Sequence, residues 1–282
     1  MISPVFSQRA LSQFKKAPSS VFSKRGPTQC QIIGTSLVLV LLSLLSIVHA
    51  VPAPAPVNIG NYQCKQKSPT FDECVKKATV LAKPYIAKGV PSLAIPPVEP
   101  FSLPMIMLEQ GTGAVNYKAN LKDIKITGLS DYKFDDIKVD LPHQKVSAKV
   151  HIPVLFLESD YEINGRALLV PIRGMGLFKA NLTSVNAQIR MMGKIVKKKG
   201  QEYFEAKDTE IKLNIGDAQA NFGNLFNGDS LLSEATNKFI NENAKDIVDE
   251  VKPAIEMVAS MLMDDIANKI FKNIPVSKVF PE

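Results

Sequence analysis

The sequence is poor in the residue types on which most catalytic and metal sites depend. Its 282 residues include only three histidines and three cysteines, and the G-x-S-x-G motif that presents a nucleophilic serine is absent. Two of the histidines, His143 and His151, flank one expected strand, and the extended chain between them spans more than about 20 Å. They therefore cannot share a metal ion. We expect no catalytic residues, no metal and no cofactor, and hence no enzyme.

Acidic residues are missing from the first 50 positions, which carry five basic residues. The rest of the chain has 29 basic and 27 acidic residues, so the formal charge of +7 belongs mainly to the amino terminus. A nearly neutral remainder gives no electrostatic reason to expect nucleic acid or an anionic membrane as the main partner.

Only one long apolar run is present, from Ile32 to Val48. It follows the basic stretch and ends near a small residue, Ala50, which is the pattern of a secretory signal peptide at residues 1–50. The alternative is an uncleaved signal anchor, because a run of this length can just span a bilayer. Either arrangement places the rest outside the cytosol. We expect a secreted, extracellular protein without stable membrane association once the leader is cleaved.

Few cysteines remain after the leader. Cys30 should be removed with it, which leaves Cys64 and Cys74 in an oxidising compartment, and we expect them to form a disulfide. The bridge would stabilise the fold by roughly 2–3 kcal/mol in the chain-entropy model. Zinc is the alternative, but two cysteines without a nearby histidine supply too few ligands.

A proline-rich linker, residues 51–61, precedes a domain that we place at residues 62–282. The stretch "SPTFDECVKKATVLAKPYIAKGVP" predicts a helix. Thr70 and Glu73 have the spacing of a capping box, and Gly89 marks the carboxyl end. Pro84 should bend this helix or end its regular part. The following "PSLAIPPVEPFSLP" contains five prolines and should run extended, neither as helix nor as central strand.

Apolar and polar residues alternate from Gly113 to Phe222, which predicts about ten antiparallel strands with one dry face. Turn signals separate the runs. They are Gly128, Asn164–Gly165, Gly174, Gly193 and Lys199–Gly200.

Between Leu231 and Phe271 the period changes, and apolar side chains return every three or four positions. This predicts one helix of about 40 residues, roughly 60 Å long, with a kink at Pro253. The adjacent Asp264 and Asp265 should lie on its solvated face. Strands grouped before a helix predict an α+β fold, in which a strongly curved antiparallel sheet covers the helix. Either the core is filled or an elongated apolar cavity remains beside the helix.

Residues that could line such a cavity follow from the alternation of inward and outward side chains. One wall would contain Tyr117, Val139, Val150, Tyr161, Phe178, Leu182 and Ile189, and the other Phe239, Ile255, Met257 and Met261. A buried tyrosine hydroxyl needs a hydrogen-bond partner, so Tyr117 and Tyr161 are the candidates for contacting a ligand oxygen. Asn181 begins the one sequon for N-glycosylation and would have to point outward from its strand.

Several long motifs resemble the insect takeout and haemolymph juvenile hormone-binding protein family. They are "DECVKKATVLAKPYIAKGVPSLAIPPVEP" with the upstream Cys64, "YEINGRALLVPIRGMGLF", "LFNGDSLLSEATNKFINENAKDIVDEVKPAIEMV" and "IPVSKVFPE". Ala244 departs from the pattern, because many members have tryptophan there.

The resemblance implies a curved sheet around a long helix with an elongated hydrophobic tunnel, and the Cys64–Cys74 bridge. It also implies a secreted carrier of a small lipophilic ligand, such as a juvenile hormone-like terpenoid or another lipid. The alternative is a secreted signalling protein of the same fold with a filled core, which would act on a receptor or another secreted protein through its surface.

Overall fold

The computed structural model describes residues 63–282, with residues 94, 111–114 and 273 excepted. The expected signal peptide at 1–50 and the linker at 51–61 lie outside the described residues. None of the helices in the described ranges is long and apolar enough to cross a membrane.

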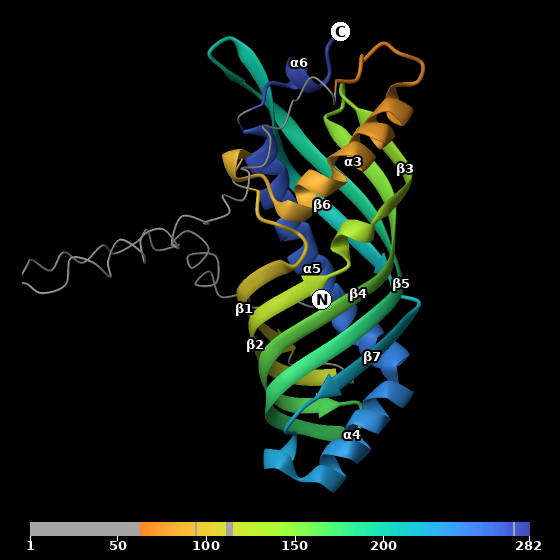
Figure 1. Ribbon diagram of the computed structural model, residues 1–282, viewed down its shortest axis with the longest axis vertical. Helices are drawn as coiled ribbons and strands as arrows, with labels where there is room; N and C mark the ends of the chain where they lie inside the picture. Colours follow the sequence, from red (N-terminus) through yellow and green to blue (C-terminus); the bar gives the residue numbers. More distant parts are fainter. Residues whose placement is uncertain (1–62, 94, 111–114, 273) are drawn as a thin grey trace, which may run out of the picture. The chain divides into compact units, whose positions relative to one another are not determined.

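Seven strands lie between an amino-terminal helix and a carboxyl-terminal group of helices (Figure 1), which confirms the α+β class. In chain order the elements are α3 (Phe71–Lys88), η2 (Pro91–Leu93), β1 (Phe101–Gln110), β2 (Val115–Thr127), η3 (Leu129–Asp131), β3 (Lys133–Asp140), β4 (Lys145–Ala167), β5 (Val170–Lys198), β6 (Gln201–Asn214), β7 (Asp217–Phe222), η4 (Phe226–Gly228), α4 (Ser230–Glu242), α5 (Ala244–Phe271) and α6 (Val276–Val279).

The strands form one antiparallel sheet in the order β1-β2-β4-β5-β6, with β3 paired to β4 and β7 paired to β5. Helix α5 contacts β6 and β7 near one end of this order and β2 near the other. At the β1 end, Leu262 of α5 packs against a cluster formed by Phe101, Leu103 and Ile124. One helix can reach both ends only because the sheet curves around it (Figure 1), as the sequence predicts.

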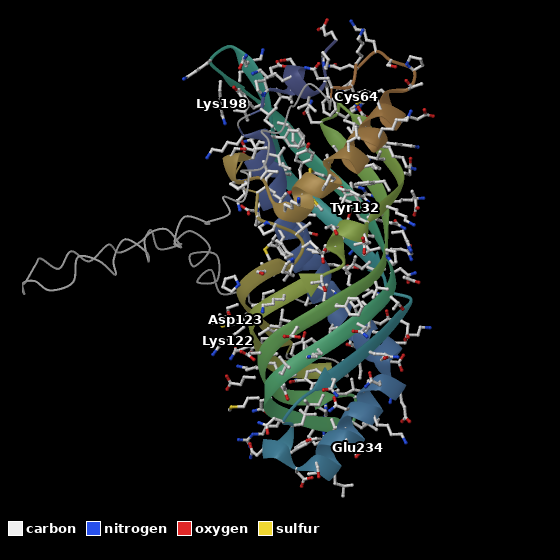
Figure 2. The ribbon with its side chains drawn as sticks, viewed as in Figure 1. Cys64, Lys122, Asp123, Tyr132, Lys198 and Glu234 are labelled. Carbon is white, nitrogen blue, oxygen red and sulfur yellow. A yellow bond between two sulfur atoms is a disulfide. The ribbon has the colours of Figure 1, made fainter. Side chains whose placement is uncertain are left out.

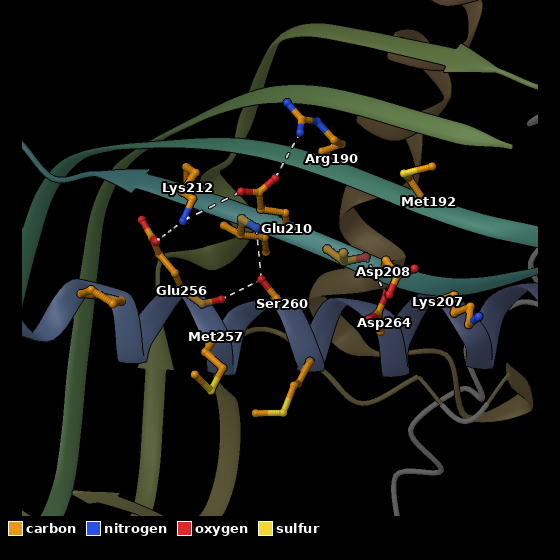
Figure 3. Close-up of a pocket in the computed structure, with 14 residues that line it drawn as sticks. Arg190, Met192, Lys207, Asp208, Glu210, Lys212, Glu256, Met257, Ser260 and Asp264 are labelled. Carbon is orange, nitrogen blue, oxygen red and sulfur yellow. Dashed lines mark hydrogen bonds and ion pairs between the residues drawn. The ribbon is translucent and has the colours of Figure 1, made fainter. Parts of the chain in front are cut away.

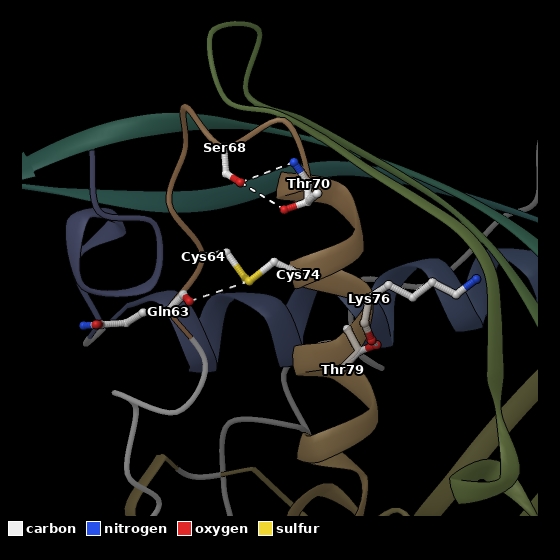
Figure 4. Close-up of a disulfide and its surroundings, with 7 residues drawn as sticks. All are labelled: Gln63, Cys64, Ser68, Thr70, Cys74, Lys76 and Thr79. Atoms are coloured by element: carbon white, nitrogen blue, oxygen red, sulfur yellow. Dashed lines mark hydrogen bonds between the residues drawn. A yellow bond between two sulfur atoms is a disulfide. The ribbon is translucent and has the colours of Figure 1, made fainter.

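The disulfide between Cys64 and Cys74 is present and joins the segment before α3 to the first turn of that helix (Figure 4). Helix α3 begins after Thr70 and ends before Gly89, as predicted. The capping box is wrong, because Thr70 makes no side-chain cap and its hydroxyl instead lies 3.0 Å from that of Ser68. The helix also continues through Pro84.

Two of the strands are much longer than expected, and three of the predicted turns are wrong. Asn164–Gly165 lies inside β4, and Gly174 and Gly193 lie inside β5. These glycines mark close backbone approach rather than turns. A β-carbon on Gly165, for example, would lie 2.3 Å from the carbonyl oxygen of Asn116 on β2. The turn at Lys199–Gly200 is confirmed, and both residues have positive φ.

The inward face of β4 and β5 changes phase halfway along the strands. Val150 on β4 and Ile189 on β5 belong to one buried cluster, whereas Tyr161 and Phe178 belong to another and have the opposite parity. The pairing register of the two strands is nevertheless the same on both sides of the change. The change lies at Pro153 and Ser184, where Ser184 has a φ of 50°. A paired irregularity of this kind keeps apolar residues inside one continuous hairpin.

The predicted single helix from Leu231 to Phe271 is wrong, because it breaks at Asn243 into α4 and α5. Asn243 has φ −113° and ψ 23°, and its amide donates a 2.8 Å hydrogen bond to the carbonyl of Phe239. Short amide side chains compete with helix continuation in this way. Pro253 lies within α5 rather than at the break.

Amide side chains of α4 occupy the edge of β7. Asn237 accepts a hydrogen bond from the backbone N–H of Phe222 at 2.8 Å and donates to its carbonyl at 3.0 Å. Asn241 makes the same pair of bonds to Ala220. The four-residue spacing puts both amides on one helix face. Each amide therefore supplies the donor and acceptor that a neighbouring strand would otherwise supply.

Polar side chains of α5 likewise form hydrogen bonds with the backbone at the edge of β6. The side-chain amide of Asn268 accepts a hydrogen bond from the backbone N–H of Ala206 and donates one to its carbonyl. Ser260 accepts from the backbone N–H of Ile211, and Glu256 accepts from that of Leu213. These polar positions also recur every four residues, and Asp264, which lies between Ser260 and Asn268, accepts from the hydroxyl of Thr209. The prediction that Asp264 faces solvent is therefore wrong, since this stripe holds the helix to the sheet edge.

Candidate functional site

The residues predicted to line a cavity do not form one continuous wall. Val139, Val150 and Ile189 lie in the cluster beneath α3 with the disulfide. The others lie elsewhere in the fold. Tyr161 and Phe178 pack near α4, Tyr117 packs near the start of α5, Leu182, Phe239 and Ile255 are partly buried, and Met257 and Met261 are on α5. The sheet residues among them are buried or partly buried, and whether any of them contacts a ligand stays a prediction.

Tyr117 on β2 is buried against Ile247 and Val251 of α5. Burial raises the pKa of its hydroxyl above the usual value. Within the part of the chain that the structure describes, no hydrogen bond of this hydroxyl is found, and the oxygen itself is not fully buried. Tyr117 therefore keeps both a donor and an acceptor for a guest molecule.

Tyr161 on β4 is different, because its hydroxyl donates a 2.8 Å hydrogen bond to the carbonyl of Gly223. Its ring packs edge-on against Phe222, with 5.2 Å between the ring centroids. Burial raises the pKa of Tyr161 to about 12. Since its proton is already donated, Tyr161 can offer a ligand only an acceptor, and Tyr117 is the better candidate of the two.

Ser159 is a site residue that the sequence reasoning missed. Its side chain is only 3% exposed, and its hydroxyl is the one buried side-chain oxygen or nitrogen without a partner among the described residues. It follows the inward parity of Tyr161 on β4 and lies opposite a bulge in β2, where Asp123 (labelled in Figure 2) has a φ of 50°. An unpaired buried hydroxyl costs about 1–3 kcal/mol, so we expect a buried water or a ligand oxygen to pair with it.

The apolar residues in the middle of α5 lie outside the buried clusters. The start of the helix joins the buried clusters through Ile247 and Val251, and its last part joins them through Leu262 and Ala267. Between them, Ile255, Met257 and Val258 are only partly buried and belong to none of the clusters in the described ranges. Flexible methionine side chains suit a space that adapts to a guest.

A groove of about 550 Å³ lies along this part of α5 (Figure 3). Its size is in the range of small-molecule sites. Apolar side chains contributed by β5 and α5 are Met192, Pro253, Met257 and Met261. The groove is open to solvent, so the enclosed tunnel stays a prediction.

The other side of the groove is charged, and four of its charged residues form a chain of ion pairs. Lys212 lies 3.1 Å from the carboxylate of Glu256 and 3.9 Å from that of Glu210, which in turn lies 3.3 Å from Arg190. Glu256 is buried and also accepts a hydrogen bond from the backbone N–H of Leu213. These ion pairs and the hydrogen bond hold α5 against β6. Because the paired side chains are already engaged, a ligand would contact the apolar part of the groove.

The histidines lie apart from this region and from each other. His143 pairs with Asp140 at the turn after β3, at 2.8 Å, and this hydrogen bond is the main reason that the pKa of Asp140 is lowered. His151 instead contacts the side-chain oxygen of Asn186 on β5 at 2.9 Å. Across the described ranges, no three histidine, cysteine or acidic side chains come close enough together to hold a metal ion.

Comparison with known proteins fits this architecture. The family model described as haemolymph juvenile hormone binding protein (JHBP) matches residues 37–281. The chain belongs to the haemolymph juvenile hormone binding protein family. The solved structure of takeout 1 from Epiphyas postvittana superposes with a TM-score of 0.68 at 23% identity, covering 78% of this chain and 100% of that one. That likeness shows the fold, namely the curved sheet around a carboxyl-terminal helix.

Two curated relatives are similar to this chain over most of their length. The circadian clock-controlled protein daywake of Drosophila melanogaster is 24% identical over 263 residues, which are 89% of this chain and 98% of that protein. A putative β-carotene-binding protein of Schistocerca gregaria is 24% identical over 217 residues, which are 76% of this chain and 85% of that protein.

Proposed function

We propose that the protein is a secreted carrier that holds a small hydrophobic ligand between the curved sheet and the middle of α5. The observation that carries the proposal is the buried, unpaired hydroxyl of Ser159 on an otherwise apolar inner face. The position of Ile255, Met257 and Val258 outside the buried clusters supports it. The family and the name of the Schistocerca gregaria relative point in the same direction.

Binding would be driven by removing apolar ligand surface from water, at about 25 cal/mol per Å² before ordering costs. The hydroxyls of Ser159 and Tyr117 would then orient the guest. Both favour a lipid with an ester, epoxide, ketone or carboxyl oxygen, as in a juvenile hormone-like terpenoid or a fatty acid. A pure hydrocarbon such as β-carotene would leave both hydroxyls unpaired and should bind less well.

The test is a binding comparison between the wild type and Ser159→Ala with oxygenated terpenoids, fatty acids and hydrocarbons of similar length. The variant should lose about 3–10-fold affinity for oxygenated ligands, which corresponds to one hydrogen bond of about 0.5–1.5 kcal/mol. It should keep its affinity for hydrocarbons. Without ligand it should be at least as stable as the wild type, because a buried unpaired group has been removed.

Two variants serve as matched controls. Ser102→Ala changes an exposed serine on β1, and Tyr203→Phe changes a tyrosine on β6 whose hydroxyl bonds to Gln201. Neither should change ligand affinity, whereas Tyr117→Phe should weaken the binding of oxygenated ligands. If no ligand class binds or raises the melting temperature of the wild type, the carrier proposal fails. The alternative of a filled core that acts through its surface would then be favoured.

A further inference from the structure

The outer face of β5 carries the sequon Asn181-Leu182-Thr183 in a geometry that a glycan can use. Asn181 is exposed, whereas Leu182 is partly buried on the opposite face. The neighbouring outward pair, Lys179 on β5 and Glu158 on β4, forms a 3.4 Å ion pair and so identifies this face as the solvated one. The asparagine side chain can therefore carry a large substituent without entering the core.

Beside Asn181 lies an aromatic residue whose exposure the fold does not explain. Phe156 on β4 is directly opposite Asn181 in the pairing register and is 50% exposed. Opposed residues on antiparallel strands have their β-carbons about 4.5–5.5 Å apart on the same face. On the other side of Asn181, β7 contributes Gln219, which is also exposed.

We propose that Asn181 carries an N-linked glycan whose first N-acetylglucosamine packs on the ring of Phe156. A bond forms between the sugar's anomeric carbon and the side-chain nitrogen of Asn181 as the bond from that carbon to the lipid pyrophosphate of the oligosaccharide donor breaks. The lipid pyrophosphate leaves, and the amide nitrogen loses one proton to the transferase's base. The sugar's C–H face and acetamide methyl are apolar, and the electron-rich face of an aromatic ring attracts C–H groups. The glycan would thus cover a phenylalanine that the protein leaves in water.

The strand position does not prevent the modification. Transfer takes place on the extended chain before folding, and the folded sheet needs only to leave Asn181 outward, as it does here. The inference rests on entry into the secretory pathway, which is part of the proposed function. It does not depend on ligand binding, so the two proposals can fail separately.

The test uses the full-length chain expressed in secreting eukaryotic cells. Peptide mapping by mass spectrometry should find a glycan on Asn181, and treatment with peptide N-glycosidase should lower the intact mass. Asn181→Gln should remove the glycan, whereas Thr183→Ser should retain it. An unmodified Asn181, in medium or in cells, overturns the proposal. Ligand affinity should be the same in Asn181→Gln and wild type, which separates this test from that of the carrier.

The packing on Phe156 is tested by a double-mutant cycle of melting temperatures. Glycosylated wild type should melt about 2–4 °C above Asn181→Gln, which is the shift expected for one modest contact in a domain of this size. In the background of Phe156→Ala the difference should fall to less than half, and Phe156→Leu provides a second variant if the alanine protein folds poorly. An equal difference in both backgrounds would overturn the contact with Phe156.

Discussion

Replacing Asn237 with alanine should destabilise the fold, because this side chain makes the hydrogen bonds to the edge of β7 that a neighbouring strand would otherwise make. Its amide makes two hydrogen bonds to the backbone of Phe222, at 2.8 and 3.0 Å. Each bond contributes about 0.5–1.5 kcal/mol net, and alanine recovers about 0.5 kcal/mol through its higher helix propensity. The expected loss is therefore about 0.5–2.5 kcal/mol, or about 1–10 °C in melting temperature.

Asn241 provides an internal comparison on the same helix. It makes the same two bonds to Ala220, but it is exposed, so water can replace part of what is lost. Asn241→Ala should therefore cost less than Asn237→Ala. Lys238→Ala is the surface control, because its partner Glu242 is 3.9 Å away and such pairs contribute little.

Thermal melting gives the global effect, and hydrogen exchange gives the local one. The amide of Phe222 should exchange faster in Asn237→Ala, while amides between β4 and β5 should change only as far as global stability does. The reasoning is refuted if Asn237→Ala costs no more than Lys238→Ala. It is refuted as well if the protection of the Phe222 amide is unchanged relative to its neighbours.

Three further outcomes are expected. Serine at Cys64 or Cys74 should cost about 2–3 kcal/mol in thermal melts, and the double variant should be no worse than a single one. Because burial raises the pKa of Tyr161 to about 12, the free energy of unfolding should fall as pH rises from about 10 to 12. Tyr161→Phe should make this fall shallower in an alkaline unfolding curve, and an unchanged slope would contradict the assignment. Gly165→Ala should unfold at a much lower temperature than Gly200→Ala, since only the first substitution forces a β-carbon to 2.3 Å from backbone.

Local signals located the amino-terminal helix and some of the turns well. The helix end at Gly89 and the turn at Lys199–Gly200 follow from the conformational freedom of glycine, whereas the helix begins after Thr70 although the predicted capping box does not form. Glycines inside strands misled the prediction, because the same residue permits a turn or a close approach of another strand. At Gly165 the deciding fact is the neighbouring backbone of β2, which no local pattern contains.

The candidate site could be predicted only in part. Alternation identified Tyr117 and Tyr161 as inward residues, but it did not distinguish the free hydroxyl from the one held by Gly223. Ser159 lies two residues before Tyr161 and therefore on the same inward face of β4. The prediction considered only apolar residues at inward positions, so it did not include this serine. The asparagines of α4 likewise looked like ordinary polar helix residues, because their partners lie on a strand 15–21 residues away.

The central claim is that a hydrophobic guest occupies the space between the sheet and α5. Native mass spectrometry of the protein purified gently from culture medium tests this most directly. We expect a complex heavier than the mature chain and its glycan, which loses a small lipophilic molecule on activation. A spectrum that contains only the bare protein, from cells supplied with terpenoids and fatty acids, would contradict it.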